Sequence, residues 1–271
     1  MKISFIGGGV MAAVLIDGIL KARLYTANQI RVGEPLKSRR IYLENKYAVG
    51  VYQSNLSAID DADIVVLSIK PQNLSGILAE LKGRLTSGKT IISIVPGVSL
   101  ATLSQELNHN EVIRVMPNTP AQIGDGMSVW VSSNFITDQI IKDTQKILDT
   151  LGEQLRVPEE KFIDIATALS GSGPAYVFLF IESLVDAGVN LGMPRNMALK
   201  LVLQTVLGST KLVLASGKHT SDLKDLVASP GGTTIAALMT LEQNGFRSAI
   251  ANAVVTAYKK SLELGKGSNI D

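Results

Sequence analysis

The feature that most constrains the fold lies at the start of the chain, where the apolar run 3–6 leads directly into Gly7, Gly8 and Gly9. A helical pattern of apolar residues follows at once. A strand, a glycine-rich turn and a helix in this order are typical of a dinucleotide-binding βαβ unit. In that unit Gly7 permits the tight turn, Gly9 lets a pyrophosphate approach the backbone, and Ala12 keeps the helix close to the strand. A glycine turn in another kind of α/β protein is the alternative.

The first half of the chain alternates between predicted strands and helices. Two apolar runs, 64–67 and 91–95, have the continuous character of strands that are buried on both faces. This alternation predicts a parallel sheet with right-handed crossovers. The expected strands are 2–6, 29–33, 63–69, 90–95, 111–116 and 127–132, with a last short strand around 153–157. The expected helices are 9–23, 36–47, 72–82, 99–107 and 137–151.

After Pro158 the sequence changes character and contains no convincing alternating strand. Residues 197–208 are apolar most of the way around a helix, which predicts burial in a bundle or in a subunit interface. The small size of this half favours the interface. We therefore expect an α/β domain over 1–160 and an all-helical domain over 161–271, whose last residues, 265–271, fray. The expected helices of the second domain are 174–191, 194–216, 220–227, 232–243 and 246–265.

Composition excludes several classes of protein. The chain has no cysteine, which excludes a disulfide scaffold, a zinc–thiolate site and a thiol nucleophile. The net charge of +2 is too small to indicate a nucleic-acid partner. We expect no membrane span, because polar residues interrupt every long apolar run, and no signal peptide, because the chain opens with a strand. A cytoplasmic protein without a metal site is the expected class.

Polar residues follow the predicted strand 63–69 at the carboxyl edge of the sheet, where open α/β sheets bind ligands. Ser68 and Lys70 end this strand, and Pro71 begins the next helix. We expect the Lys70 ammonium to lie over the cofactor crevice. The alternative is an ordinary solvated lysine at a strand end.

The segment 114–120 follows another predicted strand in the same way. Its two prolines stiffen the loop, and Asn118 and Thr119 offer directed hydrogen bonds that could hold a nicotinamide amide or a substrate. A proline-stiffened connection without a ligand is the alternative. The small residues of 167–176, at the entry to the helical domain, would allow close approach of a nicotinamide ring or of another helix.

A second candidate for ligand binding is the segment 228–234, which precedes the apolar helical run 235–239. Its proline and glycines predict a helix start whose first backbone N–H groups are free, and such a start binds small anions. A carboxylate or a phosphate is therefore the expected ligand. An ordinary capped helix is the alternative, since serine and threonine also serve as caps.

The two histidines offer no general base. His109 lies in a polar turn and is expected to be exposed, and His219 precedes an expected helix cap at Thr220 or Ser221. Oxidation of an alcohol needs a base to take the hydroxyl proton. A nicotinamide enzyme without such a base could instead reduce a C=N bond, since a protonated iminium accepts a hydride directly.

Together these motifs resemble the pyrroline-5-carboxylate reductase family over residues 1–266. The resemblance rests on the order and spacing of Gly7-x-Gly9-x-x-Ala12, Lys70-Pro71-Gln72, 114–120, 170–176, Asp225 with 228–234, and Gly245-Phe246-Arg247. It implies a Rossmann-type α/β N-terminal domain, an all-α C-terminal dimerisation domain, and an active site shared between protomers. It also implies reduction of 1-pyrroline-5-carboxylate to L-proline by NAD(P)H in a homo-oligomer that is built from dimers and contacts neither nucleic acid nor membrane.

The resemblance also assigns roles to residues. Thr234 and Lys70 are the expected catalytic residues, Thr234 through a hydrogen bond to the ring nitrogen of the substrate. The expected substrate-binding residues are Asp225, Ser229, Gly231, Gly232, Thr233 and Thr234. The expected cofactor-binding residues are Gly7, Gly8, Gly9, Val10, Met11, Ala12, Glu34, Lys37, Asn55, Ser68, Lys70, Pro71 and Asn118.

The choice between cofactors depends on the end of the second strand. There Glu34 favours NAD(H), because an acidic residue at this position binds the ribose, whereas Lys37, Ser38 and Arg39 could hold a 2′-phosphate. We expect NADP(H) to be preferred and NAD(H) to be possible.

Three other readings stay open at this point. Another cyclic imine reductase would share the same motifs. A relative of the β-hydroxyacid dehydrogenases would carry a lysine acid–base residue on the helix at the domain entry, and 174–179 contains none. A dinucleotide-binding redox sensor would need no second anion site at 228–234.

Overall fold

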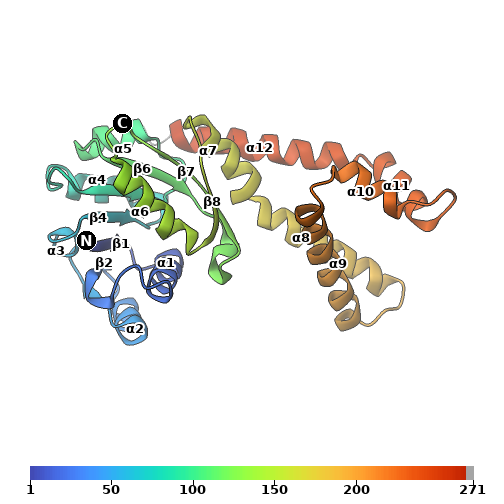
Figure 1. Ribbon diagram of the computed structural model, residues 1–271, viewed down its shortest axis with the longest axis horizontal. Coiled ribbons are helices and arrows are strands. Elements are labelled where there is room, and N and C mark those ends of the chain that lie inside the picture. Colours follow the sequence, from blue (N-terminus) through green and yellow to red (C-terminus); the bar gives the residue numbers. More distant parts are fainter. Residues whose placement is uncertain (267–271) are drawn as a thin grey trace. The chain divides into compact units, whose positions relative to one another are not determined.

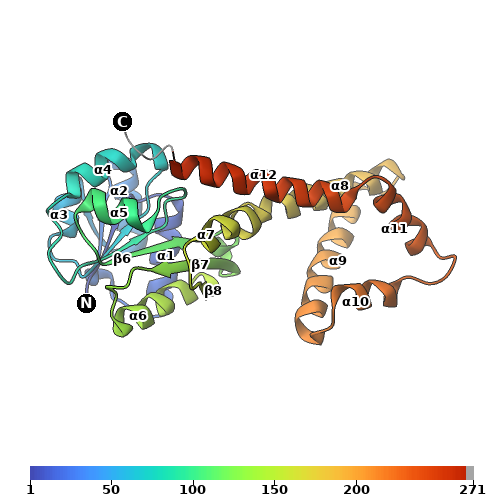
Figure 2. The same ribbon diagram turned by 90° about the horizontal axis from the view of Figure 1, so that it is seen from above.

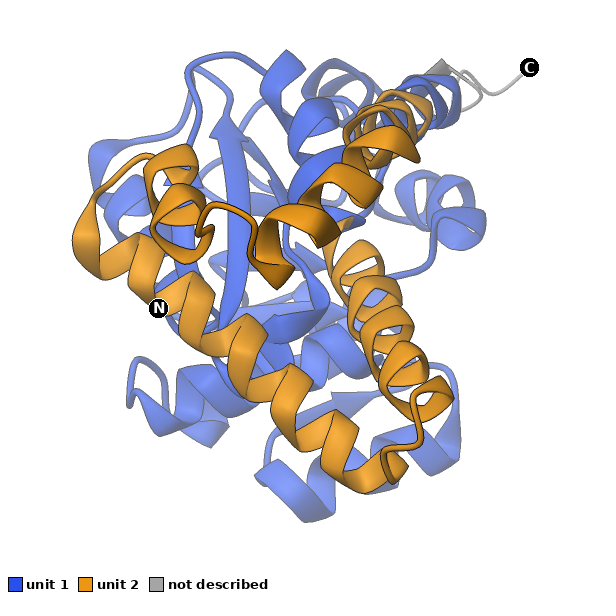
Figure 3. Cartoon of the chain, turned by 90° about the vertical axis from the view of Figure 1, so that its right-hand side faces the viewer, with its two compact units in different colours: residues 1–172, 257–271 blue, residues 173–256 orange. Residues whose placement is uncertain are grey.

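The computed structural model describes residues 1–266 and divides the chain into two compact units (Figure 3). Unit 1 comprises Met1–Ser172 together with the chain from Ala257 onward, and unit 2 comprises Gly173–Thr256. The expected boundary after residue 160 thus falls within unit 1, and the last helix starts in unit 2 and ends in unit 1. Residues 267–271, most of the tail expected to fray, lie outside the described residues.

Unit 1 is built on an eight-stranded sheet with the order β3-β2-β1-β4-β5-β6-β7-β8 (Figure 1). The strand order reverses between β1 and β4, which is the point where open α/β sheets bind ligands at their carboxyl ends. The strands are β1 (Ile3–Ile6), β2 (Ile30–Gly33), β3 (Gly50–Tyr52), β4 (Ile64–Leu67), β5 (Thr90–Ser93), β6 (Val112–Met116), β7 (Gly126–Ser132) and β8 (Gly152–Arg156).

Both faces of the sheet are covered, because each central strand sends alternate apolar side chains to opposite sides. Helices α1 and α6 lie on one face of the sheet, and α4 and α5 lie on the other (Figure 2). Ile64 and Val66 of β4 belong to the cluster with α1 and α6, whereas Val65 and Leu67 belong to the cluster with α4 and α5. Each such side chain contributes about 1.5–3 kcal/mol through burial. The covering helices are α1 (Val10–Lys21), α2 (Lys37–Tyr47), α3 (Asn55–Ile59), α4 (Leu74–Leu81), α5 (Leu100–Leu107) and α6 (Asp138–Asp149).

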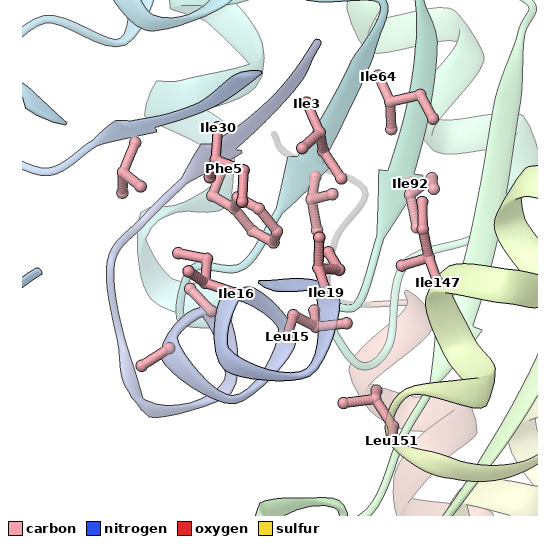
Figure 4. Packing of buried hydrophobic residues seen from close by; sticks show 14 of the residues in the cluster. Ile3, Phe5, Leu15, Ile16, Ile19, Ile30, Ile64, Ile92, Ile147 and Leu151 are labelled. Carbon is pink, nitrogen blue, oxygen red and sulfur yellow. The ribbon is translucent and has the colours of Figure 1, made fainter. Parts of the chain in front are cut away.

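The contact between β1 and α1 fixes the start of the fold. Phe5 of β1 packs against the apolar side of α1, which carries Leu15, Ile16 and Ile19 at helical spacing (Figure 4). All four side chains are buried. This packing holds the first turn of α1 directly beyond the end of β1.

Two expectations for unit 1 need correction. The sheet is not wholly parallel, because β7 runs antiparallel to β6. The connection between them holds only the 3-10 helix η3 (Thr119–Ile123), which is too short for a crossover back to a parallel strand. The chain also forms a helix that was not expected, α7 (Lys161–Ala166), which continues into the π-helical turn η4 (Thr167–Gly171).

Unit 2 is helical, as expected, and its helices begin and end close to the expected residues. Where α8 and α9 pack together, Val185 and Ala198 are buried, and Gly188 allows the close approach of Ala198. The rings of Phe180 and Phe246 lie 6.4 Å apart. The helices are α8 (Gly173–Asn190), α9 (Arg195–Ser216), α10 (Thr220–Val227), α11 (Thr233–Gln243) and α12 (Phe246–Lys266), the last of which continues into unit 1.

By length and composition, two helices could cross a membrane, Lys161–Asn190 and Arg195–Ser216, contrary to the expectation that no segment would qualify. Isolated charged residues such as Glu182 and Asp186 interrupt the apolar runs, but they leave the mean hydropathy high. Only 11% and 6% of the most apolar stretches of these helices are buried within one chain. These helices therefore present extensive apolar surface.

Candidate active site

The glycine turn after β1 has the backbone that the sequence predicted. Gly7 has a φ of +93°, and a Cβ atom there would lie 2.7 Å from the carbonyl oxygen of Ser68. Its N–H donates to the carbonyl of Gly33 at 2.8 Å. A Cβ on Gly9 would instead meet nothing within 4 Å, so this position is open to approach from outside. Gly7 thus builds the turn, and Gly9 leaves room beside it.

The first turn of α1 follows directly and has no cap. Gly9 is the N-cap residue, no side chain accepts from the first amides, and the first turn carries no acidic residue. The N–H groups of Val10, Met11 and Ala12 have no acceptor within the helix. An uncapped helix start beside an open glycine fits a pyrophosphate group, both sterically and through the helix dipole.

Ser68 and Lys70 follow β4 at the same edge of the sheet. The Ser68 hydroxyl donates to the carbonyl oxygens of Gly7 at 2.7 Å and Ile6 at 3.1 Å, so it supports the glycine turn. Lys70 is exposed and forms no ion pair within residues 1–266, and Pro71 begins the 3-10 helix η2 (Pro71–Asn73). The Lys70 ammonium is thus available to an anionic ligand at this edge.

Asn118 joins two segments that border this edge. Its Oδ1 accepts from the amide of Met127 at 2.9 Å, and its Nδ2 donates to the carbonyl of Ser170 in η4 at 3.1 Å. Gly171 of the same turn lies so close that a Cβ would be 2.8 Å from Cε of Met116. The amide of Asn118 therefore keeps one N–H for a ligand and otherwise fixes η4 against the end of β6.

The side chain of Glu34 lies inward, against the glycine turn. It is 7% exposed, its Oε2 accepts from the amide of Gly8 at 2.9 Å, and its Oε1 accepts from the amide of Leu36 at 2.9 Å. Lys37 at the start of α2 is exposed. The carboxylate that was expected to face the ribose is thus already bound to the backbone on both oxygens.

Asn55, expected on the adenosine side, is the first residue of α3. Its Nδ2 donates to Glu80 Oε2 at 2.8 Å. A Cβ on Gly33 would lie 2.6 Å from its Oδ1, so Gly33 is needed for Asn55 to approach the end of β2. Glu80 on α4 is a partner that the sequence did not indicate.

The segment 228–234 in unit 2 also ends in an uncapped helix start. Gly231 has a φ of +69°, and the amide of Gly232 donates to the carbonyl of Ser229 at 3.0 Å, which closes a turn. Gly232 is the N-cap residue of α11, and no side chain caps the helix. Thr233 and Thr234 form its first turn. This geometry differs from the ordinary capped helix that was the alternative reading.

Asp225 lies near the end of α10, before this loop. It is exposed, its Oδ1 lies 3.7 Å from Nζ of Lys224, and its carbonyl accepts from the amide of Ala228 at 3.2 Å. Its backbone thus shapes the start of the loop, and its carboxylate remains in solvent.

The histidines occupy structural positions. His109 is buried, with 8% exposed, contrary to expectation, and its Nε2 donates to the carbonyl of Lys89 at 2.6 Å. The ring is buried because this hydrogen bond holds it against the backbone just before β5. His219 is itself the N-cap of α10, where its Nδ1 accepts from the amide of Ser221 at 3.2 Å.

Sequence reasoning missed the role of Arg114, the first residue of the segment that was expected to hold a ligand. Its guanidinium is buried and lies 2.9 Å from Glu160 Oε1 and 2.8 Å from Asp164 Oδ1. The Ser261 hydroxyl of α12 donates to the same Asp164 oxygen at 3.0 Å. No local pattern predicts such partners, because they lie 46 and 50 residues away from Arg114 in the chain.

Two family models match this chain. One is described as pyrroline-5-carboxylate reductase dimerisation and matches residues 160–264. The other is described as NADP oxidoreductase coenzyme F420-dependent and matches residues 2–97. The first covers the helical part of the chain, and the second covers the glycine turn and the strands around it.

Relatives with similar sequences span the whole chain. A pyrroline-5-carboxylate reductase from Synechocystis is 42% identical over 266 residues, which cover 98% of this chain and 99% of that protein. One from Arabidopsis thaliana is 39% identical over 265 residues, with 98% and 96% covered. A crystal structure of Plasmodium falciparum pyrroline carboxylate reductase with NADP bound matches with a TM-score of 0.88 and 36% identity, and 98% of each chain is covered.

Proposed function

The chain belongs to the pyrroline-5-carboxylate reductase family, and we propose which of its residues bind the cofactor and which bind the substrate. The enzyme reduces 1-pyrroline-5-carboxylate to L-proline, with NADP(H) as its cofactor. The observation that carries the proposal is the pair of uncapped helix starts, α1 in unit 1 and α11 in unit 2. Each follows a glycine and offers backbone N–H groups to an anion.

In this proposal the start of α1 holds the dinucleotide. The amides of Val10, Met11 and Ala12 bind the pyrophosphate, and the exposed Lys70 ammonium adds a positive charge at the same edge. Lys37 is the candidate for the 2′-phosphate, because it is exposed at the start of α2. When bound, the reduced nicotinamide supplies a hydride.

The start of α11 holds the substrate. The carboxylate of the pyrroline ring accepts from the free amides of Thr233 and Thr234, which follow Gly232, and this contact fixes the orientation of the ring. The Thr234 hydroxyl then forms a hydrogen bond with the ring nitrogen. The nitrogen carries a proton while the adjacent carbon accepts the hydride, so the immediate product is the neutral secondary amine of proline, which then takes up a second proton from solvent.

No side-chain general acid is needed in this scheme. The imine nitrogen can be protonated in solution before the hydride arrives, and neither histidine lies in the glycine turn or in 228–234. We expect single replacements of the ionisable residues assigned to the two binding sites, Lys70 and Asp225, to weaken ligand binding and to leave measurable turnover. A variant that binds both ligands normally but has lost all turnover would contradict the scheme.

A β-hydroxyacid dehydrogenase activity has less support. The first turns of α8 contain no lysine, so the acid–base residue of that class is missing from the expected position. Distant structures such as prephenate dehydrogenase from Aquifex aeolicus, at 11% identity, share the fold alone.

The chain forms an oligomer, and we propose that its basic unit is a dimer built by the helices of unit 2. The exposed apolar surface of α8 and α9 supports this arrangement, since the family model that matches them describes dimerisation. We infer that a second chain, rather than lipid, covers these helices. We therefore propose an enzyme without membrane contact that works in the cytoplasm, and its net charge of +2 gives no support to a nucleic-acid partner.

The experiment that tests the proposed substrate compares two ring sizes. Oxidation of NADPH is followed by nicotinamide absorbance with 1-pyrroline-5-carboxylate and with the six-membered analogue piperideine-6-carboxylate. We expect a higher kcat/KM for the five-membered ring. Equal or better turnover of the larger ring would favour a different cyclic imine reductase.

A further inference from the structure

Arg39 reaches back from α2 to the glycine turn that follows β1. Its Nη2 donates to the carbonyl oxygen of Gly9 at 2.9 Å, and its Nε donates to the carbonyl oxygen of Gly8. The guanidinium lies over the ring of Tyr42, 4.4 Å from its centroid. A single side chain thus holds two successive carbonyl groups of the turn, and an aromatic ring supports it from the other side.

Glu34 holds the same turn by its amide. Its Oε2 accepts from the amide of Gly8, and its Oε1 is fixed by the amide of Leu36. Gly8 is therefore bound at its N–H by Glu34, which follows β2, and at its carbonyl by Arg39 of α2. A Cβ on Gly8 would lie 2.6 Å from Cδ1 of Leu43, so the turn is also pressed closely against α2.

These contacts determine where the next amides point. The chain has no cis peptide bond in its described part, and in a trans peptide the carbonyl and the N–H point in opposite directions. When the carbonyl groups of Gly8 and Gly9 face Arg39, the N–H groups of Gly9 and Val10 face away from it. These N–H groups open the uncapped start of α1.

We propose that Arg39 is a positioning residue for the dinucleotide pyrophosphate, and that together with Glu34 it holds the glycine turn in its binding conformation before the cofactor arrives. The proposal rests on the proposed function, because it concerns the same cofactor. An ordered turn spares the cofactor the entropic cost of ordering it on binding. Because the pyrophosphate is common to both dinucleotides, Arg39 serves NADPH and NADH equally.

This role differs from that of a counter-ion for the 2′-phosphate. A counter-ion acts on NADPH alone and needs only a positive charge, which lysine also supplies. The clamp needs the planar fork of arginine, because two carbonyl groups are held at once. Lys37, which is exposed and forms no ion pair within residues 1–266, is suited to the phosphate instead.

The test measures cofactor binding by the full chain without substrate, through nicotinamide fluorescence. We expect Arg39→Lys to raise the Kd of NADPH and that of NADH by the same factor, roughly tenfold. The matched control, Lys37→Ala, should raise the Kd of NADPH only. In steady-state assays Arg39→Lys should raise the KM of both cofactors and largely preserve kcat.

A second pair of variants guards against misfolding of the first. Tyr42 is on the surface, so Tyr42→Leu should fold normally, yet it removes the ring beneath the guanidinium. Tyr42→Leu should raise the Kd of NADPH and that of NADH by the same factor, which should be smaller than in Arg39→Lys. Tyr42→Phe keeps the ring and should have the Kd values of the wild-type protein. Unchanged Kd values in Arg39→Lys and Tyr42→Leu, or a loss confined to NADPH, would overturn the proposal. If the wild-type chain bound neither dinucleotide, the proposed function itself would fail.

Discussion

Gly7 and Gly9 stand two positions apart in one turn, and the structure gives them different tasks. Gly7 is required by the fold, because its positive φ and its contact with Ser68 leave no space for a Cβ. Gly9 has an ordinary φ of −67° and open space around it, so the fold would accept a larger residue there. The need for glycine at this position comes from the ligand.

This difference predicts the behaviour of Gly9→Ala. The added methyl group should leave the thermal midpoint almost unchanged and should raise the Kd of NADPH about tenfold or more, because it occupies space that the pyrophosphate needs. Gly76→Ala on α4 is the matched control, since a Cβ there also meets nothing within 4 Å. Equal cofactor binding in both variants would show that the pyrophosphate does not approach Gly9.

Thr234 is the residue on which the proposed chemistry depends most. Loss of its hydrogen bond to the ring nitrogen should cost about 1.5–3 kcal/mol, which corresponds to roughly a 10- to 150-fold lower kcat/KM. The measurement is kcat/KM for Thr234→Ala, with the Kd of NADPH measured separately. Thr240→Ala, on the same helix, should keep full activity, because that hydroxyl only donates to the carbonyl of Ala236 at 3.1 Å. Full activity in Thr234→Ala, or a loss confined to cofactor binding, would show that 228–234 is a structural turn that does not bind the substrate.

At the scale of elements, the connection after α1 packs near α6 through Tyr25. Burial, and then the negative charges of Asp143 and Asp63, raise the pKa of Tyr25 from 10.0 to about 12. The fold thus favours the neutral phenol. The stability from this preference is complete below pH 10, the value expected for the unfolded chain, and is lost as the pH rises towards 12.

Tyr25→Phe should remove this dependence on pH. We expect wild type and variant to have similar urea midpoints at about pH 8, and the variant to be the more stable at about pH 11. The difference should be modest, because Tyr25 is partly exposed and solvent screens its charge. If the two proteins lost stability equally between these pH values, other groups would be responsible.

How much of each element could be predicted depended on its length and its periodicity. Helices α2, α5 and α10 begin and end within one residue of the expected positions, because apolar spacing and end signals agree there. Strand β3 and helix α3 are three and five residues long, too short for a period to show. The antiparallel direction of β7 depends on the length of the preceding connection, which a strand pattern does not contain.

The candidate site divides in the same way. The two helix starts could be located from their glycines and, at 228–234, from the proline beside them, because backbone geometry at these positions depends on local residues. The contacts of Glu34 and Asn118 could not, because their partners lie in segments that the fold brings together. The sequence indicated polar side chains at the sheet edge. Which of their atoms already form hydrogen bonds within the protein depends on the tertiary packing.

The apolar helices of unit 2 predict how the protein assembles in solution. We expect a dimer interface of more than about 2,000 Å², as obligate pairs have. Leu203→Glu on α9 should therefore shift the enzyme towards monomers in sedimentation at micromolar concentration, because it would bury a charge in the interface.

The control for this prediction makes the same chemical change elsewhere. Phe135 is an exposed apolar residue of unit 1, and Phe135→Glu should leave the sedimentation coefficient unchanged. A monodisperse monomer in the wild-type protein would contradict the proposed interface. So would an unchanged assembly in Leu203→Glu.

The chain crosses between its two units twice, after η4 and within α12. Asp164 contacts both crossing segments, because it belongs to α7, which leads into η4, and it binds α12. The Asp164 carboxylate accepts a hydrogen bond from the Ser261 hydroxyl of α12 and forms an ion pair with the buried Arg114 of β6. Removing one partner of a buried ion pair costs up to about 3–5 kcal/mol, and less here because Glu160 still pairs with Arg114. Amide hydrogens of α7 and of the end of α12 should therefore exchange with deuterium as one cooperative group, and Asp164→Asn should accelerate both together. The two links to unit 2 would then lose order in a single event, so that neither could act as a hinge while the other stayed fixed.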